Sequence, residues 1–218
     1  MGRLKAGTIG GTTFAHVVLI GHSLGSATAI AEASTYHDVD GVVVTGALQH
    51  YRLAAFSLFQ TKPANTDPSH RFDNLPSGYL TTVPNTRGPV FYYAPGSDPA
   101  VVQYDEQTKE TTTGNEFDFL NPDGTENLNP GGITVPVLDI VGQQDAIFCG
   151  SGGAGDGVNC SSSNSVYQEE APYYSPQAHL QVNVMPLTGH DLNLHYSAQA
   201  TYGIIIGWLF THWNGSNQ

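Results

Sequence analysis

The stretch VVLIGHSLGS, residues 17–26, decides the fold of this chain. Four apolar residues lead into Gly-x-Ser-x-Gly, and a small-residue, Ala-rich helical pattern follows at once. This order predicts a buried strand, a sharp turn and a helix, with Ser23 at the apex of the turn. We expect Gly21 and Gly25 to be required, because a Cβ at either position would crowd so tight a turn. Open α/β sheets bind ligands at the carboxyl ends of their strands, so Ser23 is a candidate functional residue.

Composition limits the class of protein and its partners. The 218 residues suffice for one domain with a substantial core, and the hydrophobic fraction of 39% is ordinary for a soluble fold. No uninterrupted apolar run approaches the roughly 18 residues that span a bilayer. A net charge of −12 with seven Lys and Arg argues against binding to nucleic acid or anionic membranes, whose phosphates require basic patches. We interpret the acidity as an aid to solubility.

Strands and helices alternate at both ends of the sequence. Apolar runs predict buried strands at residues 16–21, 40–45, 135–141 and 180–185, and helical spacing predicts helices at 23–37 and 196–213. This alternation is typical of an α/β fold with a mostly parallel sheet covered by helices.

The middle of the chain, residues 47–133, lacks both periodicities and is rich in Pro, Asn, Asp, Thr and aromatic residues. So long an irregular loop is improbable in a compact domain, so we expect an inserted cap or lid with short helices at 51–59 and 99–111. The chain then divides into 1–46, the first part of the core, 47–133, the cap, and 134–218, the second part. The cap aromatics either line an acyl pocket or only bury the cap against the core: Tyr51, Phe56, Phe59, Tyr79, Phe91, Tyr92 and Tyr93.

Two further residues stand where chemistry with Ser23 requires them. A serine hydroxyl is a poor nucleophile near neutral pH and needs a histidine base, which in turn needs a carboxylate partner. In hydrolases with a strand–turn–helix serine, the order along the chain is serine, acid, histidine. Asp145 follows the third predicted strand and His190 follows the fourth, so both lie at the same sheet edge as Ser23. The sequence therefore predicts a Ser-Asp-His triad.

Other residues compete for these roles. Ser23 could be an ordinary helix N-cap, a position that serine favours. Asp139 is a rival acid, but it lies in the middle of a strand, whereas Asp145 lies on a loop that can reach a histidine. His22 is adjacent to the serine, so we expect it to pack or hydrogen-bond within the turn.

Two residues after the predicted histidine also need an interpretation. Asp191 directly follows His190, so we expect it to face away from that ring, with capping of the segment before the last helix as one role. A metal site formed by His195 and Asp191 is conceivable, but the spacing fits no common helical or ribbon site. We expect no metal and no cofactor.

The segments around the three predicted residues resemble the α/β-hydrolase superfamily, of the kind found among secreted fungal members. The resembling segments are GHSLG at 21–25, GQQDAIFCG at 142–150 and TGHDLN at 188–193. They span most of this chain and correspond to the carboxyl-terminal two-thirds of such a hydrolase, with the middle region as the variable cap. The resemblance implies that Ser23 is the nucleophile, Asp145 the acid and His190 the general base, and that the Leu24 N–H is an oxyanion-hole donor.

The resemblance also implies a reaction and an alternative. We expect a serine hydrolase that cleaves a small-molecule carboxylic ester or a related acyl substrate; amide, thioester and acyl-transfer chemistry stay open. A cofactor-free oxygenase or perhydrolase on the same scaffold has no distinguishing residue here. The family's second oxyanion donor comes from a loop after an earlier strand, which residues 1–15 do not supply. The alternative is therefore a non-catalytic or N-terminally truncated relative with an incomplete oxyanion hole.

Two cysteines and two glycosylation sequons indicate the compartment. Cys149 and Cys160 flank a Gly- and Ser-rich segment, where a disulfide would close a short surface loop. Two thiols without nearby partner ligands do not make a zinc site. Asn159 and Asn214 each begin an Asn-x-Ser sequon. With the few lysines and the acidic balance, these features predict a secreted protein, although residues 1–15 do not read as a signal peptide. The oligomeric state is not indicated.

Overall fold

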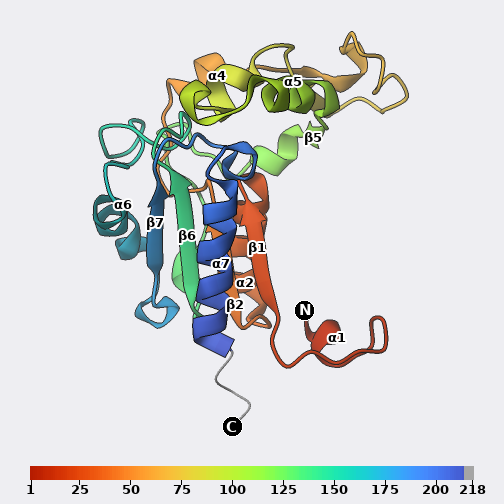
Figure 1. Ribbon diagram of the computed structural model, residues 1–218. Coiled ribbons are helices and arrows are strands. Elements are labelled where there is room, and N and C mark those ends of the chain that lie inside the picture. The colour runs from red at the N-terminus through yellow and green to blue at the C-terminus, as the bar shows by residue number, and fades with distance from the viewer. Residues whose placement is uncertain (214–218) are drawn as a thin grey trace.

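The computed structural model describes residues 1–213 and is built around a four-stranded parallel sheet. Its strands lie in the order β1, β2, β6, β7 (Figure 1). Their bounds are Val18–His22 for β1, Gly41–Thr45 for β2, Val137–Gly142 for β6 and Gln181–Met185 for β7. Each strand begins and ends within two residues of its predicted range, and all three pairings are parallel. The predicted α/β class is confirmed.

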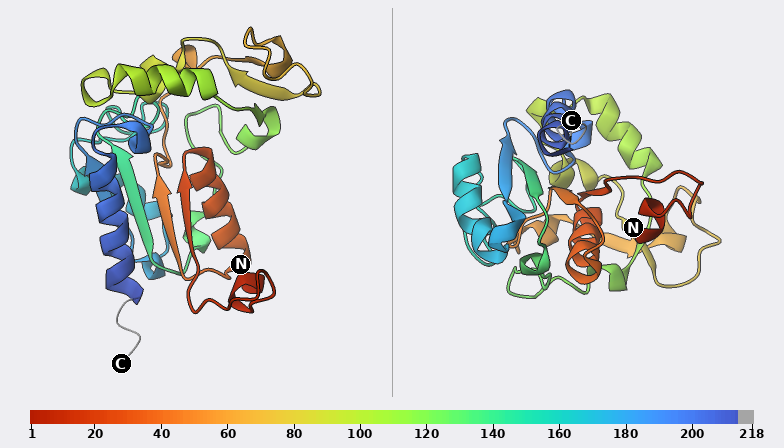
Figure 2. Two further views of the ribbon diagram at one scale, coloured as in Figure 1. Left: turned by 45° about the vertical axis from the view of Figure 1, so that its right-hand side comes forward. Right: turned by 90° about the horizontal axis from the view of Figure 1, so that it is seen from below.

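Helices cover both faces of this sheet. Helix α7 (Ala198–Trp213) lies on one face, and α2 (Leu24–Tyr36) and α6 (Ser163–Glu170) lie on the other (Figures 1 and 2). Successive strand residues point to opposite faces, so Val42 packs with the α2 side and Val43 with the α7 side. Helix α6 is the one element of the core for which the sequence predicts no range. No helix within residues 1–213 is long and apolar enough to cross a membrane.

Strand β1, which leads to Ser23, lies at an edge of the sheet as far as the structure describes it. Within residues 1–213 it pairs with β2 alone, and Ile20 in its middle is 54% exposed. The segment before it holds a short helix, α1 (Gly2–Lys5), and no strand, in agreement with the sequence.

The middle region lies over the carboxyl ends of the parallel strands (Figure 1). It contains three short helices, α3 (Ala55–Leu58), α4 (Arg87–Phe91) and α5 (Pro99–Thr108). It also contains an antiparallel sheet of β3 (Thr61–Pro63), β4 (Tyr79–Thr82) and β5 (Thr112–Thr113), which the sequence does not predict because its strands are so short. The helices expected at 51–59 and 99–111 are present in shorter form. The division of the chain at 46/47 and 133/134 stays a prediction.

Single 3₁₀ turns connect many of these elements. They lie at Ala64–Thr66, Ala94–Gly96, Gly114–Phe117, Pro130–Gly132, Ala171–Tyr173, Pro176–Ala178 and Leu192–Leu194.

The predicted disulfide between Cys149 and Cys160 is present. The Cys149 backbone N–H donates to the carbonyl of Asp145 at 3.0 Å, so the crosslink also restrains the loop that follows β6. Of the two predicted sequons, Asn159 is exposed, and Asn214 lies outside the described residues.

The turn after β1 depends on a close approach between strand and helix. A Cβ on Gly21 would lie 2.4 Å from the carbonyl oxygen of Gly25 and 2.6 Å from Cα of Ser26, so only glycine fits. The matching expectation for Gly25 is wrong. A Cβ there would meet nothing within 4 Å, because it projects from the first turn of α2 into open space.

Replacing each glycine separately tests this packing. We expect Gly21→Ala to lower the free energy of unfolding by about 1–3 kcal/mol, because the methyl group overpacks a backbone contact that cannot relax. Gly25→Ala is the matched control and should leave stability unchanged or slightly raised, since alanine is the better helix former. Equilibrium urea unfolding measures both. Equal destabilisation by the two variants would contradict the packing described.

Candidate active site

Ser23 stands on a strained turn between β1 and α2. Its backbone has φ 51° and ψ −119°, in the positive-φ region that non-glycine residues rarely adopt. The Ser23 N–H donates to the carbonyl of Thr45 at 2.8 Å, which fixes the turn against β2. Ser23 occupies the N-cap position of α2, but its hydroxyl makes no capping hydrogen bond. The N-cap interpretation therefore does not explain this serine.

The amino end of α2 faces the same space as Ser23. Leu24 is the first residue of the helix, and both Leu24 and Ser23 line a pocket beside the turn. The first N–H groups of a helix have no partner within the helix and carry its positive dipole end. This position therefore favours an anion that develops near Ser23.

Asp145 and His190 meet at the carboxyl edge of the sheet. Asp145 Oδ2 lies 2.8 Å from His190 Nδ1, and both side chains are buried, with 1% and 2% of their surface exposed. Asp145 Oδ1 accepts hydrogen bonds from the N–H groups of Ile147 and Phe148 at 2.8 and 3.2 Å. The carboxylate is thus fully paired and fixes the orientation of the imidazole ring. Two of the three predicted residues are in direct contact.

The ring of His190 is held among aromatic side chains. Phe91 lies 5.5 Å from it, Phe148 stacks on it at 5.9 Å, and His22 lies at 5.1 Å, all between ring centroids. Burial by itself lowers the pKa of His190, but the charge and hydrogen bond of Asp145 and the charge of Asp191 outweigh it, so the pKa is raised.

Within residues 1–213, no hydrogen bond joins the Ser23 hydroxyl to His190. Nδ1 of His190 is engaged by Asp145, so Nε2 is the nitrogen left for exchange of a proton. Serine–histidine contacts in hydrolases are often long until a substrate is bound. The third side of the predicted triad therefore stays a prediction.

Asp139 lies where the sequence expects it, in the middle of β6, fully buried and away from His190. Neither of its carboxylate oxygens has a hydrogen-bond partner among the described residues. Burial, with contributions from Glu170 and Glu126, raises the pKa of Asp139 well above its usual range. Asp145, and not Asp139, is the carboxylate that contacts the histidine.

His22 makes hydrogen bonds, as predicted, but its partners lie outside the turn, on β2 and in the segment after β7. Its Nδ1 lies 3.0 Å from Thr45 Oγ1, and its Nε2 lies 3.2 Å from Asp191 Oδ1. Asp191 Oδ2 lies 3.9 Å from the Arg87 guanidinium. Burial by itself raises the pKa of Asp191. The hydrogen bond to His22 and the positive charges around the carboxylate outweigh burial, so the pKa is lowered.

The expectation that Asp191 faces away from His190 and caps the next segment is wrong. Asp191 precedes the 3₁₀ turn Leu192–Leu194, but its side chain makes no capping bond. One ligand atom from each of His22, His190 and Asp191 lies within 4.8 Å of the others, a donor set of the kind that metals use. The Asp191 side chain turns toward these histidines because His22 hydrogen-bonds its carboxylate and the Arg87 guanidinium lies nearby.

His195 is a structural residue. Its Nε2 accepts hydrogen bonds from the N–H groups of Tyr93 and Gly189 at 3.0 and 2.9 Å, and its Nδ1 lies 2.8 Å from the carbonyl of Asp191. The ring also stacks on Tyr92. Both ring nitrogens are occupied, so the conceivable metal site with Asp191 has no free nitrogen on this histidine.

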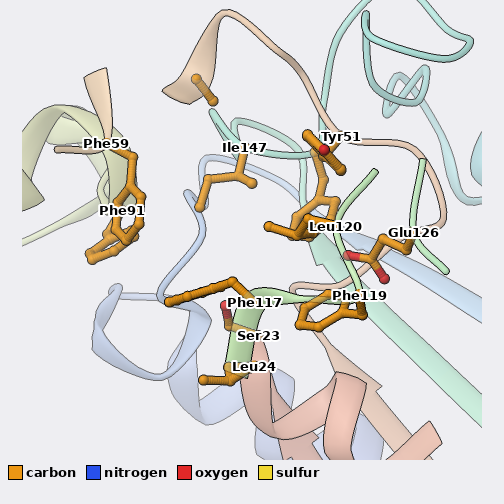
Figure 3. Close-up of a pocket in the computed structure, with 12 residues that line it drawn as sticks. Ser23, Leu24, Tyr51, Phe59, Phe91, Phe117, Phe119, Leu120, Glu126 and Ile147 are labelled. Carbon is orange, nitrogen blue, oxygen red and sulfur yellow. The ribbon is translucent and has the colours of Figure 1, made fainter. Parts of the chain in front are cut away.

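An apolar pocket of about 180 Å³ lies beside Ser23 (Figure 3). The residues that line it are Ser23, Leu24, Tyr51, Ala55, Phe59, Phe91, Phe117, Phe119, Leu120, Glu126, Ile147 and Phe148. Three of the cap aromatics singled out in the sequence are among them: Tyr51, Phe59 and Phe91. Tyr92 packs on His195 instead, and the Phe56 side chain lies outside the described part of the structure.

The sequence does not identify seven of the pocket residues, of which Ala55 lies in α3. Phe117, Phe119, Leu120 and Glu126 come from an irregular segment of the middle region, and Ile147 and Phe148 follow Asp145. Only the last two carried a signal, because a residue next to a predicted catalytic acid is bound to lie near the site.

The sequence matches no protein-family model and no curated protein. The fold is similar to that of a monoacylglycerol lipase from Paleococcus ferrophilus, with a TM-score of 0.54 and 18% identity over 90% of this chain and 69% of that one. It is also similar to a soluble variant of monoglyceride lipase from Saccharomyces cerevisiae in complex with a substrate analog. The TM-score is 0.58 at 15% identity, over 96% of this chain and 65% of that one.

This chain thus spans about two-thirds of the length of both lipases. Its parallel sheet, its strand–turn–helix serine and these similarities agree with the fold that the sequence predicts. The chain has the α/β-hydrolase fold.

Proposed function

We propose that this chain carries the catalytic centre of a serine hydrolase that cleaves a carboxylic ester through an acyl-enzyme. Ser23 is the nucleophile, His190 the general base and Asp145 the carboxylate that orients the histidine. The observation that carries this proposal is the 2.8 Å hydrogen bond between Asp145 and His190 at the same sheet edge as the strained turn of Ser23. A buried carboxylate on Nδ1 leaves Nε2 as the basic nitrogen, which is what a serine nucleophile requires.

The first half of the reaction forms the acyl-enzyme. Ser23 Oγ attacks the carbonyl carbon of the ester, and its proton passes to Nε2 of His190. The resulting oxyanion accepts a hydrogen bond from the Leu24 N–H at the positive end of α2. The bond from carbon to the alcohol oxygen then breaks, and His190 returns the proton to the departing alcohol.

The second half repeats these steps with water. His190 takes a proton from a water molecule, the hydroxide adds to the acyl carbon, and the oxyanion again faces Leu24. The bond to Ser23 Oγ then breaks, His190 returns the proton to that oxygen, and the carboxylic acid is released. Throughout, Asp145 stays ionised and stabilises the imidazolium form of His190.

The pocket supports a substrate with an apolar or aromatic arm. Rings of Phe59, Phe91 and Phe117 surround the space next to Ser23 (Figure 3). The two structural neighbours are named as lipases of monoacylglycerols, whose acyl chains are also apolar. We therefore place the substrate among small esters with one hydrophobic arm.

We also propose that the protein is extracellular and carries a glycan on Asn159. The disulfide between Cys149 and Cys160 and the exposure of Asn159 support this assignment, because disulfides persist in oxidising compartments.

A fluorophosphonate probe tests the nucleophile directly. We expect covalent labelling of Ser23 in the folded protein, located by peptide mass spectrometry. Ser23→Ala should abolish it, while Ser26→Ala is the matched control three residues further along the chain and should retain it. Absence of labelling, or equal labelling of Ser23→Ala, would favour the alternative of a non-catalytic chain or an incomplete oxyanion hole.

The choice of carboxylate is tested by comparing two aspartates near β6. Asp145→Asn should lower kcat for a p-nitrophenyl ester by about 10⁴-fold, because the amide favours the wrong tautomer of His190. Asp139→Asn should keep activity near that of the wild type, since this side chain does not contact His190. A large loss in Asp139→Asn with a folded far-UV spectrum would contradict the assignment.

The pH dependence of kcat/KM follows from the raised pKa of His190. Only neutral His190 can act as a base, so activity should fall as the pH decreases through a pKa above that of an ordinary histidine. Asp145→Asn should move this acidic limb to lower pH, because the charge that stabilises the imidazolium is gone. A limb that stays in place in Asp145→Asn would mean that another group titrates.

A further inference from the structure

One acidic side chain lies among the apolar walls of the pocket. Glu126 is the one carboxyl group among the described residues that line it, and its neighbours there include Phe119, Leu120 and Tyr51 (Figure 3). Glu126 is only 9% exposed. A carboxyl group in such a place is unfavourable unless it has a hydrogen-bonding role.

The backbone holds Glu126 firmly in this position. Its N–H donates to the carbonyl of Gln49 at 3.1 Å, and it pairs with Leu120 across a β-bridge. The turn between them is closed by the Asn121 N–H, which donates to the carbonyl of Thr125 at 2.9 Å. The restrained turn therefore fixes the backbone of Glu126 beside the pocket that this residue lines.

The Glu126 carboxyl group is not fully hydrogen-bonded within residues 1–213. Its Oε2 is buried and has no hydrogen-bond partner there. The charge that acts on Glu126 comes from another acidic residue, Glu170. Burial, and then the carboxyl group of Glu170, raise the pKa of Glu126 well above its usual range.

Glu126 and Glu170 both form hydrogen bonds with the backbone of Gln49. The Gln49 N–H donates to both carboxylate oxygens of Glu170, at 3.0 and 3.2 Å, while the Gln49 carbonyl binds Glu126. Asp139 of β6 adds a third buried carboxyl group to this region, since both Glu170 and Glu126 raise its pKa. Raised pKa values favour the neutral forms of these acids, which can both donate and accept a hydrogen bond.

We propose that Glu126 is a specificity-determining residue whose carboxyl group hydrogen-bonds a hydroxyl on the substrate arm that fills this aromatic pocket. A hydroxyl both donates and accepts, so it matches a carboxylic acid as well as a carboxylate. Aromatic walls favour an aromatic arm through offset and edge-to-face contacts. The preferred arm is therefore a hydroxyaryl group. The identity of the reacting ester rests on the proposed function, but binding of the arm does not.

Two soluble amides that differ in one group test this preference. They are 3-(4-hydroxyphenyl)propanamide and 3-(4-methylphenyl)propanamide, in which a methyl group replaces the hydroxyl. Ligand-observed NMR titration of the wild-type chain should give a Kd about tenfold lower for the hydroxyl probe, the effect of one well-formed hydrogen bond. A third probe with an aminomethyl group in the same place distinguishes a cation site.

Three variants assign the preference to a residue. Glu126→Leu should remove it, and Glu126→Gln should retain most of it, because the amide still donates and accepts. Glu170→Gln is the matched control, since it neutralises a buried acid of the same cluster that does not line the pocket, and it should keep the preference. If Glu126→Leu does not fold, the side-chain carboxyl carbon of ¹³C-labelled Glu126 should shift with the hydroxyl probe and not with the methyl probe.

Equal affinities of the wild type for the hydroxyl and methyl probes would overturn the inference. So would a preference that survives in Glu126→Leu, or tightest binding of the aminomethyl probe. Hydrolysis of the two corresponding methyl esters separates the inference from the proposed function. Cleavage of both at the same kcat/KM would refute the role of Glu126 and leave the hydrolase intact. Selective binding without cleavage of either ester would refute the hydrolase and leave the role of Glu126 intact.

Discussion

A close backbone contact lies between Gly21 and the first turn of α2, and the candidate chemistry depends on it. Because no side chain intervenes, the chain reverses from β1 into the helix within one strained residue, Ser23. The hydroxyl is thereby turned away from capping, and the first amide of α2, at Leu24, faces the same pocket. Thr45 holds this turn from the neighbouring strand through the Ser23 N–H. The strained backbone of Ser23 thus fixes the direction of its side chain.

The buried carboxyl groups of this fold fall into two kinds, which differ in their partners. The carboxyl groups of Asp145 and Asp191 have partners: two backbone N–H groups and His190 for the first, and His22 and Arg87 for the second. The carboxyl groups around Gln49 lie within the same fold but have no cationic partner among the described residues. Paired acids suit catalysis, where a stable charge must orient a base. Unpaired acids kept from ionising suit recognition by hydrogen bonds instead.

Local signals account for the parts that the sequence predicts well. Continuous apolar runs locate the four parallel strands within two residues, because a strand covered on both faces needs such a run. Asp145 and His190 are found from their place just after two of these strands. Glu126 and Phe117 are not, since they enter the pocket through turns whose path is set by distant partners such as Gln49. The motif predicts a packing role for Gly25. This prediction is wrong, because a Cβ on Gly25 would meet no atom within 4 Å.

We propose that Ser23, held on its strained turn, attacks a carbonyl beside the amide of Leu24. A crystal structure of the protein after reaction with an aryl phosphonate tests it most directly. We expect a bond between phosphorus and Ser23 Oγ, a phosphoryl oxygen within hydrogen-bond distance of the Leu24 N–H, and the aryl group in the pocket of Figure 3. Attachment to another residue, or a phosphoryl oxygen turned away from Leu24, would contradict it.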